Sequence, residues 1–370
     1  MHKIPLIRPE IDASSLCQAV KKIAKTGMLT KGEYIQTFQK DLGRYLNVKY
    51  VFAVSSCTTA LHLALLAIGI KAGDEVLVSD FSFPASANVI IHAGAKPVFV
   101  DIDLETFCLN MEDLKSKVSK KTKAIMVVHA FGYPADMSEI LKIAQKYKLV
   151  VIEDAACAIG SKHKSKFCGA WGDLGCFSFH PRKLLTTGEG GAVVTNNPKL
   201  AERIEILRNH GGIYTKKGWE FVEAGFNYRL SEIAAALGVE QLKTLDQTIK
   251  NRQKLARKYI QKLIKINGII VQNEPKDGNF NFQSFVILLP ADVDRDDLIS
   301  FLKKQNIETT IGTYAMHTQK TYKDFKPDIC KNSAFAYKHS LTLPLYDRMT
   351  DKEMNYVVKN VVQALACLTA

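Results

Sequence analysis

A pair of carboxylates closes an apolar run at residues 150–157, whose sequence is VVIEDAAC. In open α/β sheets, ligands bind at the carboxyl ends of the strands, so Glu153 and Asp154 stand at a favourable place for a binding site. The alternative is a strand that simply ends in a capping acid. On this segment alone the capping acid is the favoured interpretation, and a binding site needs support from other segments.

A lysine followed by a glycine-rich loop lies at residues 177–195, FSFHPRKLLTTGEGGAVVT. Glycines let a backbone approach a ligand closely, and the Ser178 hydroxyl can bond to an anion. The spacing is neither that of a nucleotide-triphosphate loop nor that of a dinucleotide-binding turn. Lys183 can act as a Schiff-base nucleophile, because burial lowers the pKa of a lysine. The alternative is an ordinary surface lysine.

Two further polar turns precede helix-like segments. The first, SSCTTAL at residues 55–61, can hold a phosphate on the N–H groups at the helix start, or it can be a plain N-cap. In the second, GFNYRLSE at residues 225–232, Asn227 and Arg229 can cap the next helix or reach a ligand. No Cys–His pattern makes Cys57 a catalytic thiol, and no spacing of cysteines or histidines predicts a metal site.

These segments lie between elements that alternate in type. The first half predicts helices at 12–26, 58–68, 85–92 and 137–147, and strands at 50–54, 75–78, 97–100, 124–128 and 149–152. Apolar strands alternating with helices indicate a parallel sheet covered on both faces. The second half predicts strands at 176–179, 192–195, 281–289 and 307–310, and helices at 198–210, 231–264, 294–304 and 350–365. The long helix leads out of the first domain, so we expect a large domain at 1–250 and a smaller one at 251–370.

The composition is that of a globular α/β protein. Of 370 residues, 47% are hydrophobic and 24% charged, which excludes disordered, collagenous and coiled-coil chains. The longest apolar stretch, 60–70, is too short to cross a bilayer, and the N-terminus has no signal-peptide pattern. Eight cysteines in such a chain predict reduced thiols and a cytoplasmic location. The net charge of +13 comes from dispersed lysines with one denser run at 115–123, which favours a solvated surface over nucleic-acid binding and is compatible with an anionic substrate.

Taken together and in this order, the segments resemble the DegT/DnrJ/EryC1/StrS family of nucleotide-sugar aminotransferases. The resemblance covers almost the whole chain through GMLTKGEYIQTFQKDLGRYL, SSCTTALHLAL, VVIEDAACAIG, FSFHPRKLLTTGEGGAVVT, GFNYRLSEIAAALGVEQL and LPLYDRMTDKEM. Its most specific part is the lysine segment with TTGEGG, downstream of EDAA. The resemblance implies pyridoxal 5′-phosphate (PLP) as cofactor. It also implies the fold-type I, aspartate-aminotransferase-like scaffold, with a mostly parallel central sheet and a smaller C-terminal α/β domain.

The resemblance also implies roles for single residues. Lys183 matches the lysine that forms a Schiff base with PLP, and Asp154 matches the carboxylate that pairs with the pyridine nitrogen. Further cofactor contacts match Cys57, Thr58, Phe83 and Ser178. Phe83 would stack on the ring, although it can also be an ordinary core residue. Asn227 matches a residue that reaches the phosphate of the neighbouring subunit, which implies a homodimer with shared active sites.

Two residues depart from the family pattern. Cys157 stands where the family often has a glutamine that contacts the 3′-oxygen of the ring, and a thiol is a poor hydrogen-bond donor. Cys57 stands at the glycine of an S-G-T phosphate loop, where backbone N–H groups still bind phosphate if the position needs no positive φ. One branch of the family has a histidine in place of the lysine and performs dehydration, so Lys183 favours transamination.

We therefore expect an aminotransferase that moves the amino group of L-glutamate, through pyridoxamine phosphate (PMP), to a nucleotide-activated keto-deoxysugar. A 4-keto-6-deoxyhexose is preferred over a 3-keto sugar, for glycan or surface-polysaccharide precursors. Residues expected to contact the substrate are His180, Arg182, Arg229, Tyr314 and His317. Tyr314 and His317 can also belong to a merely structured loop. The alternatives are a cyclitol aminotransferase or a sugar dehydratase on the same scaffold, or a non-catalytic, basic regulatory protein.

Overall fold

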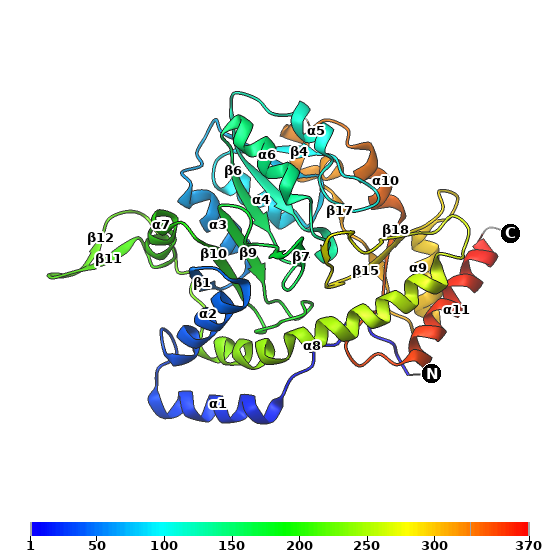
Figure 1. Ribbon diagram of the computed structural model, residues 1–370, viewed down its shortest axis with the longest axis horizontal. Coiled ribbons are helices and arrows are strands. Elements are labelled where there is room, and N and C mark those ends of the chain that lie inside the picture. The colour runs from blue at the N-terminus through cyan, green and yellow to red at the C-terminus, as the bar shows by residue number, and fades with distance from the viewer. Residues whose placement is uncertain (1, 326, 369–370) are drawn as a thin grey trace.

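The computed structural model describes residues 2–325 and 327–368, and its larger part is built on a seven-stranded sheet (Figure 1). The strands are β1 (Tyr50–Val54), β2 (Glu75–Ser79), β4 (Lys96–Val100), β5 (Thr122–Val128), β6 (Val150–Asp154), β9 (Leu174–Ser178) and β10 (Gly191–Thr195). Their order is β1-β10-β9-β6-β5-β2-β4. Every pair from β9 to β4 is parallel, whereas β10 runs antiparallel to both of its neighbours. The predicted, mostly parallel sheet is confirmed.

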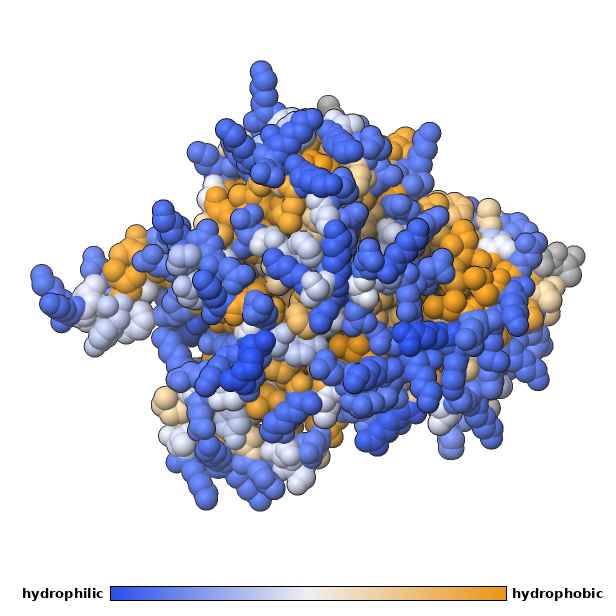
Figure 2. Space-filling view, viewed as in Figure 1, coloured by the Kyte–Doolittle hydropathy of each residue, from blue (hydrophilic) through white to orange (hydrophobic). Residues whose placement is uncertain are grey.

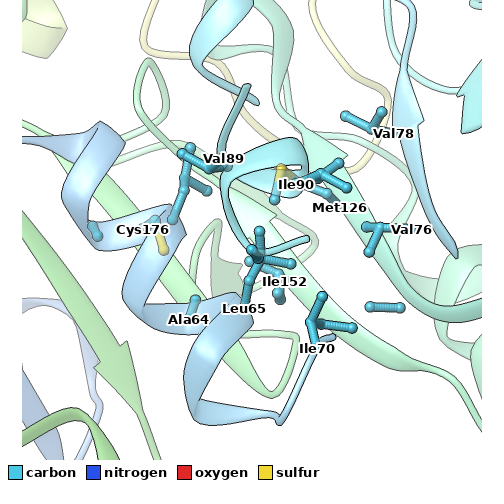
Figure 3. Packing of buried hydrophobic residues seen from close by; sticks show 14 of the residues in the cluster. Ala64, Leu65, Ile70, Val76, Val78, Val89, Ile90, Met126, Ile152 and Cys176 are labelled. Carbon is cyan, nitrogen blue, oxygen red and sulfur yellow. The ribbon is translucent and has the colours of Figure 1, made fainter. Parts of the chain in front are cut away.

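Helices cover both faces of this sheet. They are α1 (Ala13–Thr26), α2 (Glu33–Leu46), α3 (Cys57–Ala67), α4 (Pro84–His92), α5 (Met111–Ser116), α6 (Met137–Tyr147), α7 (Pro198–Arg208) and α8 (Glu232–Leu263). Successive strand residues point to opposite faces, so Val76 and Val78 share one core with residues of α3 and α4 (Figure 3). Helix α7 packs on the same core. Leu77 between them packs on the side of α6, and α2 and the first half of α8 cover the same side.

The small domain is a four-stranded antiparallel sheet with helices packed on it. Its elements are β13 (Ile270–Val271), β15 (Phe285–Leu288), β16 (Thr310–Ile311), β18 (Ser340–Leu343), α9 (Arg295–Lys304) and α11 (Asp351–Leu368). Helix α8 joins the two parts, because Leu245 and Ile249 belong to the core of the large sheet while Leu255 and Tyr259 belong to the core of the small one. The domain division expected at residue 250 therefore falls inside one continuous helix (Figure 1).

Several short elements are absent from the sequence-based expectations. They are β3 (Phe81–Ser82), β7 (Lys162–His163), β8 (Lys166–Phe167), β11 (Gly212–Thr215), β12 (Gly218–Phe221), β14 (Gly278–Asn279), β17 (Tyr314–Ala315), α10 (Lys331–His339) and the 3₁₀ turns Ala130–Gly132, Met316–Thr318 and Lys320–Phe325. Strands β11 and β12 form a hairpin that projects from the body (Figure 1). The expected strands at 281–289 and 307–310 are shorter or displaced, as β15 and β16.

The visible surface is mostly hydrophilic. Figure 2 shows hydrophilic side chains over most of the visible face, with apolar residues in separate patches. Among the residues that the structure describes, no helix combines the length and the apolar character needed to cross a membrane.

Candidate active site

A cavity of about 530 Å³ opens where the carboxyl ends of the central strands meet the small domain. Asp154 ends β6, Ser178 ends β9, and Cys57 begins α3, so three elements of the large domain converge there. The small domain contributes Thr310 and Thr342 to the wall. The expected site residues that line this cavity are Cys57, Thr58, Phe83, Asp154, Cys157, Ser178, His180, Arg182 and Lys183.

Lys183 is held in a turn directly after β9. Its backbone N–H donates to the His180 carbonyl at 2.8 Å. The side chain of Gln283 binds the backbone on both sides of Lys183. Its Oε1 accepts from Leu184 N at 3.0 Å, and its Nε2 donates to the Arg182 carbonyl at 2.7 Å. The amine of Lys183 is thereby directed into the cavity and is not that of a freely exposed surface lysine.

The Lys183 ammonium is only 3.0 Å from the Cys157 sulfur. Burial alone lowers the pKa of Lys183, whereas the thiols of Cys157 and Cys57 and the carboxylate of Asp154 raise it. The net direction of the Lys183 pKa is upward. The lysine is therefore protonated at neutral pH while its amine has only these neighbours.

Asp154 is a buried carboxylate on the cavity wall. It accepts the Ser86 hydroxyl at 2.7 Å and the Ala156 N–H at 3.2 Å. Burial raises the pKa of Asp154, and these two hydrogen bonds and the Lys183 charge only partly oppose that rise. Among the described residues Asp154 forms no ion pair within 4 Å, so a cation in the cavity would stabilise its charged form.

Glu153 points to the opposite face from Asp154, because neighbouring residues of a strand alternate in direction. It is fully buried and accepts the backbone N–H groups of Gly169, Trp171 and Gly172 at 2.6–2.7 Å. Glu153 also accepts His129 Nε2 at 2.9 Å. Of the two carboxylates at this strand end, Glu153 therefore has a structural role, because it holds the loop after β8 in place.

The N-terminus of α3 meets β10 at the cavity. Ser56 caps the helix, and its hydroxyl accepts Thr59 N while the Thr59 hydroxyl accepts Ser56 N. The first N–H groups of a helix have no acceptor within it and attract anions. Gly191 of β10 packs so closely that an added Cβ would lie 2.5 Å from the Ser56 carbonyl carbon. Cys57 is not among the residues with positive φ, so its backbone needs no glycine.

The aromatic Phe83 lines the cavity and is 65% exposed, which excludes the core interpretation. Its ring lies 6.5 Å from that of Tyr314, which is outside the cavity wall. His317 also lies outside. Its Nδ1 is 2.6 Å from Asp80 Oδ2, and its backbone N–H donates to Asp80 Oδ1. These two contacts with Asp80 do not support the expected contact between His317 and substrate.

Asn227 and Arg229 do not reach the cavity of their own chain. Asn227 is exposed, and Arg229 Nη1 donates to Asn209 Oδ1 at 2.7 Å. The helix that follows is capped by Ser231, whose hydroxyl accepts Ala234 N. The capping alternative for Asn227 and Arg229 is therefore wrong.

Three residues of the site have no counterpart in the sequence-based expectations: Ser86, Gln283 and His129. Ser86 lies in α4, 68 positions before Asp154, and Gln283 lies 101 positions beyond Arg182. The imidazole of His129 accepts Ala135 N at Nδ1 and so donates from Nε2 to Glu153. Separation along the chain leaves no local spacing that could have pointed to these contacts.

Comparisons with known proteins agree with this geometry. A family model described as the DegT/DnrJ/EryC1/StrS aminotransferase family matches residues 10–362. The chain is 36% identical to the GDP-perosamine synthase of Escherichia coli O157:H7, over 98% of each chain. It is 36% identical to the spore coat polysaccharide biosynthesis protein SpsC of Bacillus subtilis (strain 168), with 97% of this chain and 96% of SpsC covered. The crystal structure of the aminotransferase TlmJ from Streptoalloteichus hindustanus is similar with a TM-score of 0.94 at 30% identity, covering 99% of this chain and 100% of TlmJ.

Proposed function

Because this chain belongs to the DegT/DnrJ/EryC1/StrS aminotransferase family, we propose that it transfers an amino group from L-glutamate to a nucleotide-activated keto-deoxysugar. The chain is a PLP-dependent aminotransferase of the fold-type I class. The observation that carries the proposal is one cavity that holds Lys183, Asp154 and the N-terminus of α3 together.

The residues of the cavity fit PLP. A phosphate suits the N–H groups at the start of α3, where Gly191 leaves no room for a Cβ, and the Ser178 hydroxyl on the same wall. A protonated ring nitrogen suits Asp154, a buried carboxylate that lacks an ion pair among the described residues. The face of exposed Phe83 suits the ring. When bound, PLP supplies an electron sink for a carbanion at the substrate carbon.

The chain's own residues supply binding and proton transfer. Asp154 keeps the ring nitrogen protonated, and Ser86 holds that carboxylate by its hydroxyl at 2.7 Å. Lys183 takes a proton from the substrate carbon in one half-reaction and returns one in the other, as a general base whose backbone Gln283 fixes. His180 and Arg182, on the cavity wall beside Lys183, are placed to contact the substrate. With PLP bound, the Cys157 sulfur would stand where the family pattern often has a glutamine that contacts the ring's 3′-oxygen.

The proposed substrate is a 4-keto-6-deoxyhexose on a nucleoside diphosphate, with glycan or surface-polysaccharide precursors as the product class. The names of two relatives support this choice: a GDP-perosamine synthase and a spore coat polysaccharide biosynthesis protein. The net charge of +13 suits a substrate that carries a diphosphate.

We further propose a homodimer in the cytoplasm. The projecting hairpin exposes Tyr214 (77%), Phe221 (68%) and Trp219 (50%), an apolar surface of the kind that a second subunit covers. Asn227 is exposed and so free to reach the phosphate of a neighbouring active site, as the family pattern implies. All eight cysteines are free thiols, which is typical of a reducing compartment.

The test is a two-step absorbance experiment on purified protein. With PLP, the wild type should show the visible band of lysine-bound cofactor, and L-glutamate should bleach it; Lys183→Ala should show no such band. The bleached enzyme is then offered 4-keto and 3-keto sugars on GDP, UDP and dTDP, and keto-cyclitols. Return of the band with a 4-keto nucleotide sugar supports the proposal. Return only with a keto-cyclitol indicates a cyclitol aminotransferase, water loss from the sugar indicates a dehydratase, and no bound PLP favours a regulatory protein.

A further inference from the structure

Lys183 and Cys157 meet on the wall of the cavity. The Nζ atom of Lys183 lies 3.0 Å from Cys157 Sγ, which is its single side-chain partner in residues 2–325 and 327–368. Both side chains are partly exposed and line the cavity, so a small oxidant can reach the sulfur. The backbone of Cys157 is also fixed, because Asn281 Nδ2 donates to its carbonyl at 2.9 Å. The nucleophilic nitrogen and the oxidisable sulfur are therefore held together without a competing partner for the nitrogen.

We propose that Cys157 is an oxidation site at which hydrogen peroxide leads to a reversible sulfur–nitrogen bond with Lys183. The link forms when Lys183 is not bound to the cofactor, in the PMP form or in the absence of cofactor. This timing rests on the proposed function, whereas the bond itself needs only the two side chains.

The chemistry balances with peroxide as the oxidant. Peroxide transfers one oxygen to the thiol, which becomes a sulfenic acid, and one water leaves. Lys183, which is protonated in this state, first loses one proton to water. The lone pair of the resulting neutral amine then attacks the sulfur, the S–O bond breaks, and the leaving hydroxide takes a second proton from the nitrogen and departs as the second water. The sulfur has been oxidised by two electrons and peroxide reduced by two. A dithiol reductant reverses the step: its first thiol attacks the sulfur and releases the amine, and its second thiol breaks the resulting mixed disulfide, so that Cys157 returns to the thiol and the reductant leaves as a disulfide.

The proposed bond requires an accessible thiol and an unpaired lysine amine beside it, and each of the other cysteines lacks at least one of these. Burial raises the pKa of the thiols of Cys57, Cys108, Cys168, Cys176 and Cys330. The exposed Cys17 and Cys367 contact no lysine amine among the described residues. The nearest comparison is Cys330, whose sulfur lies 3.8 Å from Lys117 Nζ. That sulfur is fully buried, and Lys117 is already paired with Asp113 at 2.9 Å, so this second pair is a matched internal control.

The test is peptide mapping by mass spectrometry after a short peroxide treatment. Three samples are compared: protein with PLP, protein with PLP and L-glutamate, and protein without added cofactor. In the last two we expect the Cys157 and Lys183 peptides to be joined, lighter by two hydrogen atoms than their sum and separated by dithiothreitol. PLP alone should reduce the joined fraction at least severalfold. Cys157→Ser should abolish the product, and Cys330→Ser should leave it unchanged.

The outcomes separate this inference from the proposed function. Cys157 oxidised to sulfenic or sulfinic acid without ever joining Lys183, in wild-type protein lacking PLP, overturns the inference. Equal joining with and without PLP overturns the role of Lys183 as the cofactor lysine while the oxidation site stands. A joined product at Lys117 and Cys330 of similar yield would refute the argument from exposure and free amine.

Discussion

Glu153 and Asp154 are neighbours in sequence, yet the structure predicts opposite effects for the same amide substitution. Glu153 uses both oxygens: Oε1 accepts Trp171 N at 2.7 Å and Gly172 N at 2.6 Å, and Oε2 accepts Gly169 N at 2.7 Å and His129 Nε2 at 2.9 Å. A glutamine offers one oxygen and one NH₂ group. Whichever way it turns, the NH₂ group faces two donors, so Glu153→Gln loses two hydrogen bonds.

The histidine cannot rescue the variant by exchanging its protons. The Nδ1 of His129 accepts Ala135 N at 3.1 Å, so a proton moved to Nδ1 would face that N–H. Each hydrogen bond to a charged group contributes about 1.5–3 kcal/mol, which puts the loss for Glu153→Gln at about 3–6 kcal/mol. That loss is a large fraction of the total stability of a typical protein.

Asp154→Asn is the matched control one residue away. An asparagine oxygen can still accept the Ala156 N–H, and its NH₂ group can donate to the Ser86 oxygen, whose hydroxyl then donates to Ser82 Oγ. The substitution also removes a buried charge that has no ion pair among the described residues. We therefore expect a stability change within about 1 kcal/mol. Its activity should fall at least a hundredfold, because the ring nitrogen of PLP loses its charged partner.

Urea unfolding followed by circular dichroism measures both variants, and the absorbance of lysine-bound PLP measures their cofactor sites. The folded fraction of Glu153→Gln should still bind PLP, because its side chain faces away from the cavity. A Glu153→Gln variant as stable as wild type would refute the hydrogen-bond count. An Asp154→Asn variant as unstable as Glu153→Gln would refute the assignment of the two carboxylates to different faces.

Three further predictions follow from the same geometry. Gly191→Ala should weaken PLP binding about tenfold or more in an absorbance titration, since overpacking against Ser56 costs about 1–3 kcal/mol. Gly69→Ala strains a backbone at φ +77° but lies outside the cavity wall, so it should cost some stability and leave PLP binding unchanged. The pKa of Asp154 is raised in the folded state, so the folded protein binds this proton more tightly than the unfolded chain. Raising the pH from the ordinary value of 3.8 through the raised value should therefore cost stability in protein without PLP, and the urea midpoint of Asp154→Asn should lack that component. Arg252→Met should lower the free energy of unfolding by about 3 kcal/mol or more, because it leaves three buried carbonyls without their donor, and an unchanged urea midpoint would contradict this.

Elements with strong local signals could be predicted from the sequence. The helix at 137–147 and the strand at 50–54 agree with α6 and β1 at both ends. The helices α1, α8 and α9 begin after Asp12, Ser231 and Asp294, whose side chains accept N–H groups of the first turn. Hydrophobic periodicity and helix caps depend on residues close together in the sequence, so they can be identified without knowledge of the fold.

The two-residue strands could not be predicted, because they form only when distant segments meet. Strand β3 pairs Phe81 with Ala315, more than 230 positions away. The helix α2 is not among the predicted elements, because no side chain caps its start at Gly32, although Phe38 and Leu42 lie in the core. In the site, Lys183 and Asp154 can be predicted from the motifs that contain them. The contacts of Gln283 and Ser86 can be identified only once the fold is known.

The two cysteines that depart from the family pattern differ in what they change. Cys57 occupies the first turn of α3, and phosphate binding there depends on backbone N–H groups and not on the side chain. Its φ is not positive, so a residue with a Cβ costs nothing at this position. Cys157 occupies a place where the side chain itself faces the chemistry, 3.0 Å from the Lys183 amine. Under the proposed function, the residue at position 57 therefore leaves the expected phosphate contacts intact. Cys157 puts a sulfur that can be oxidised where the family often has an amide that cannot, next to the lysine proposed to carry out transamination.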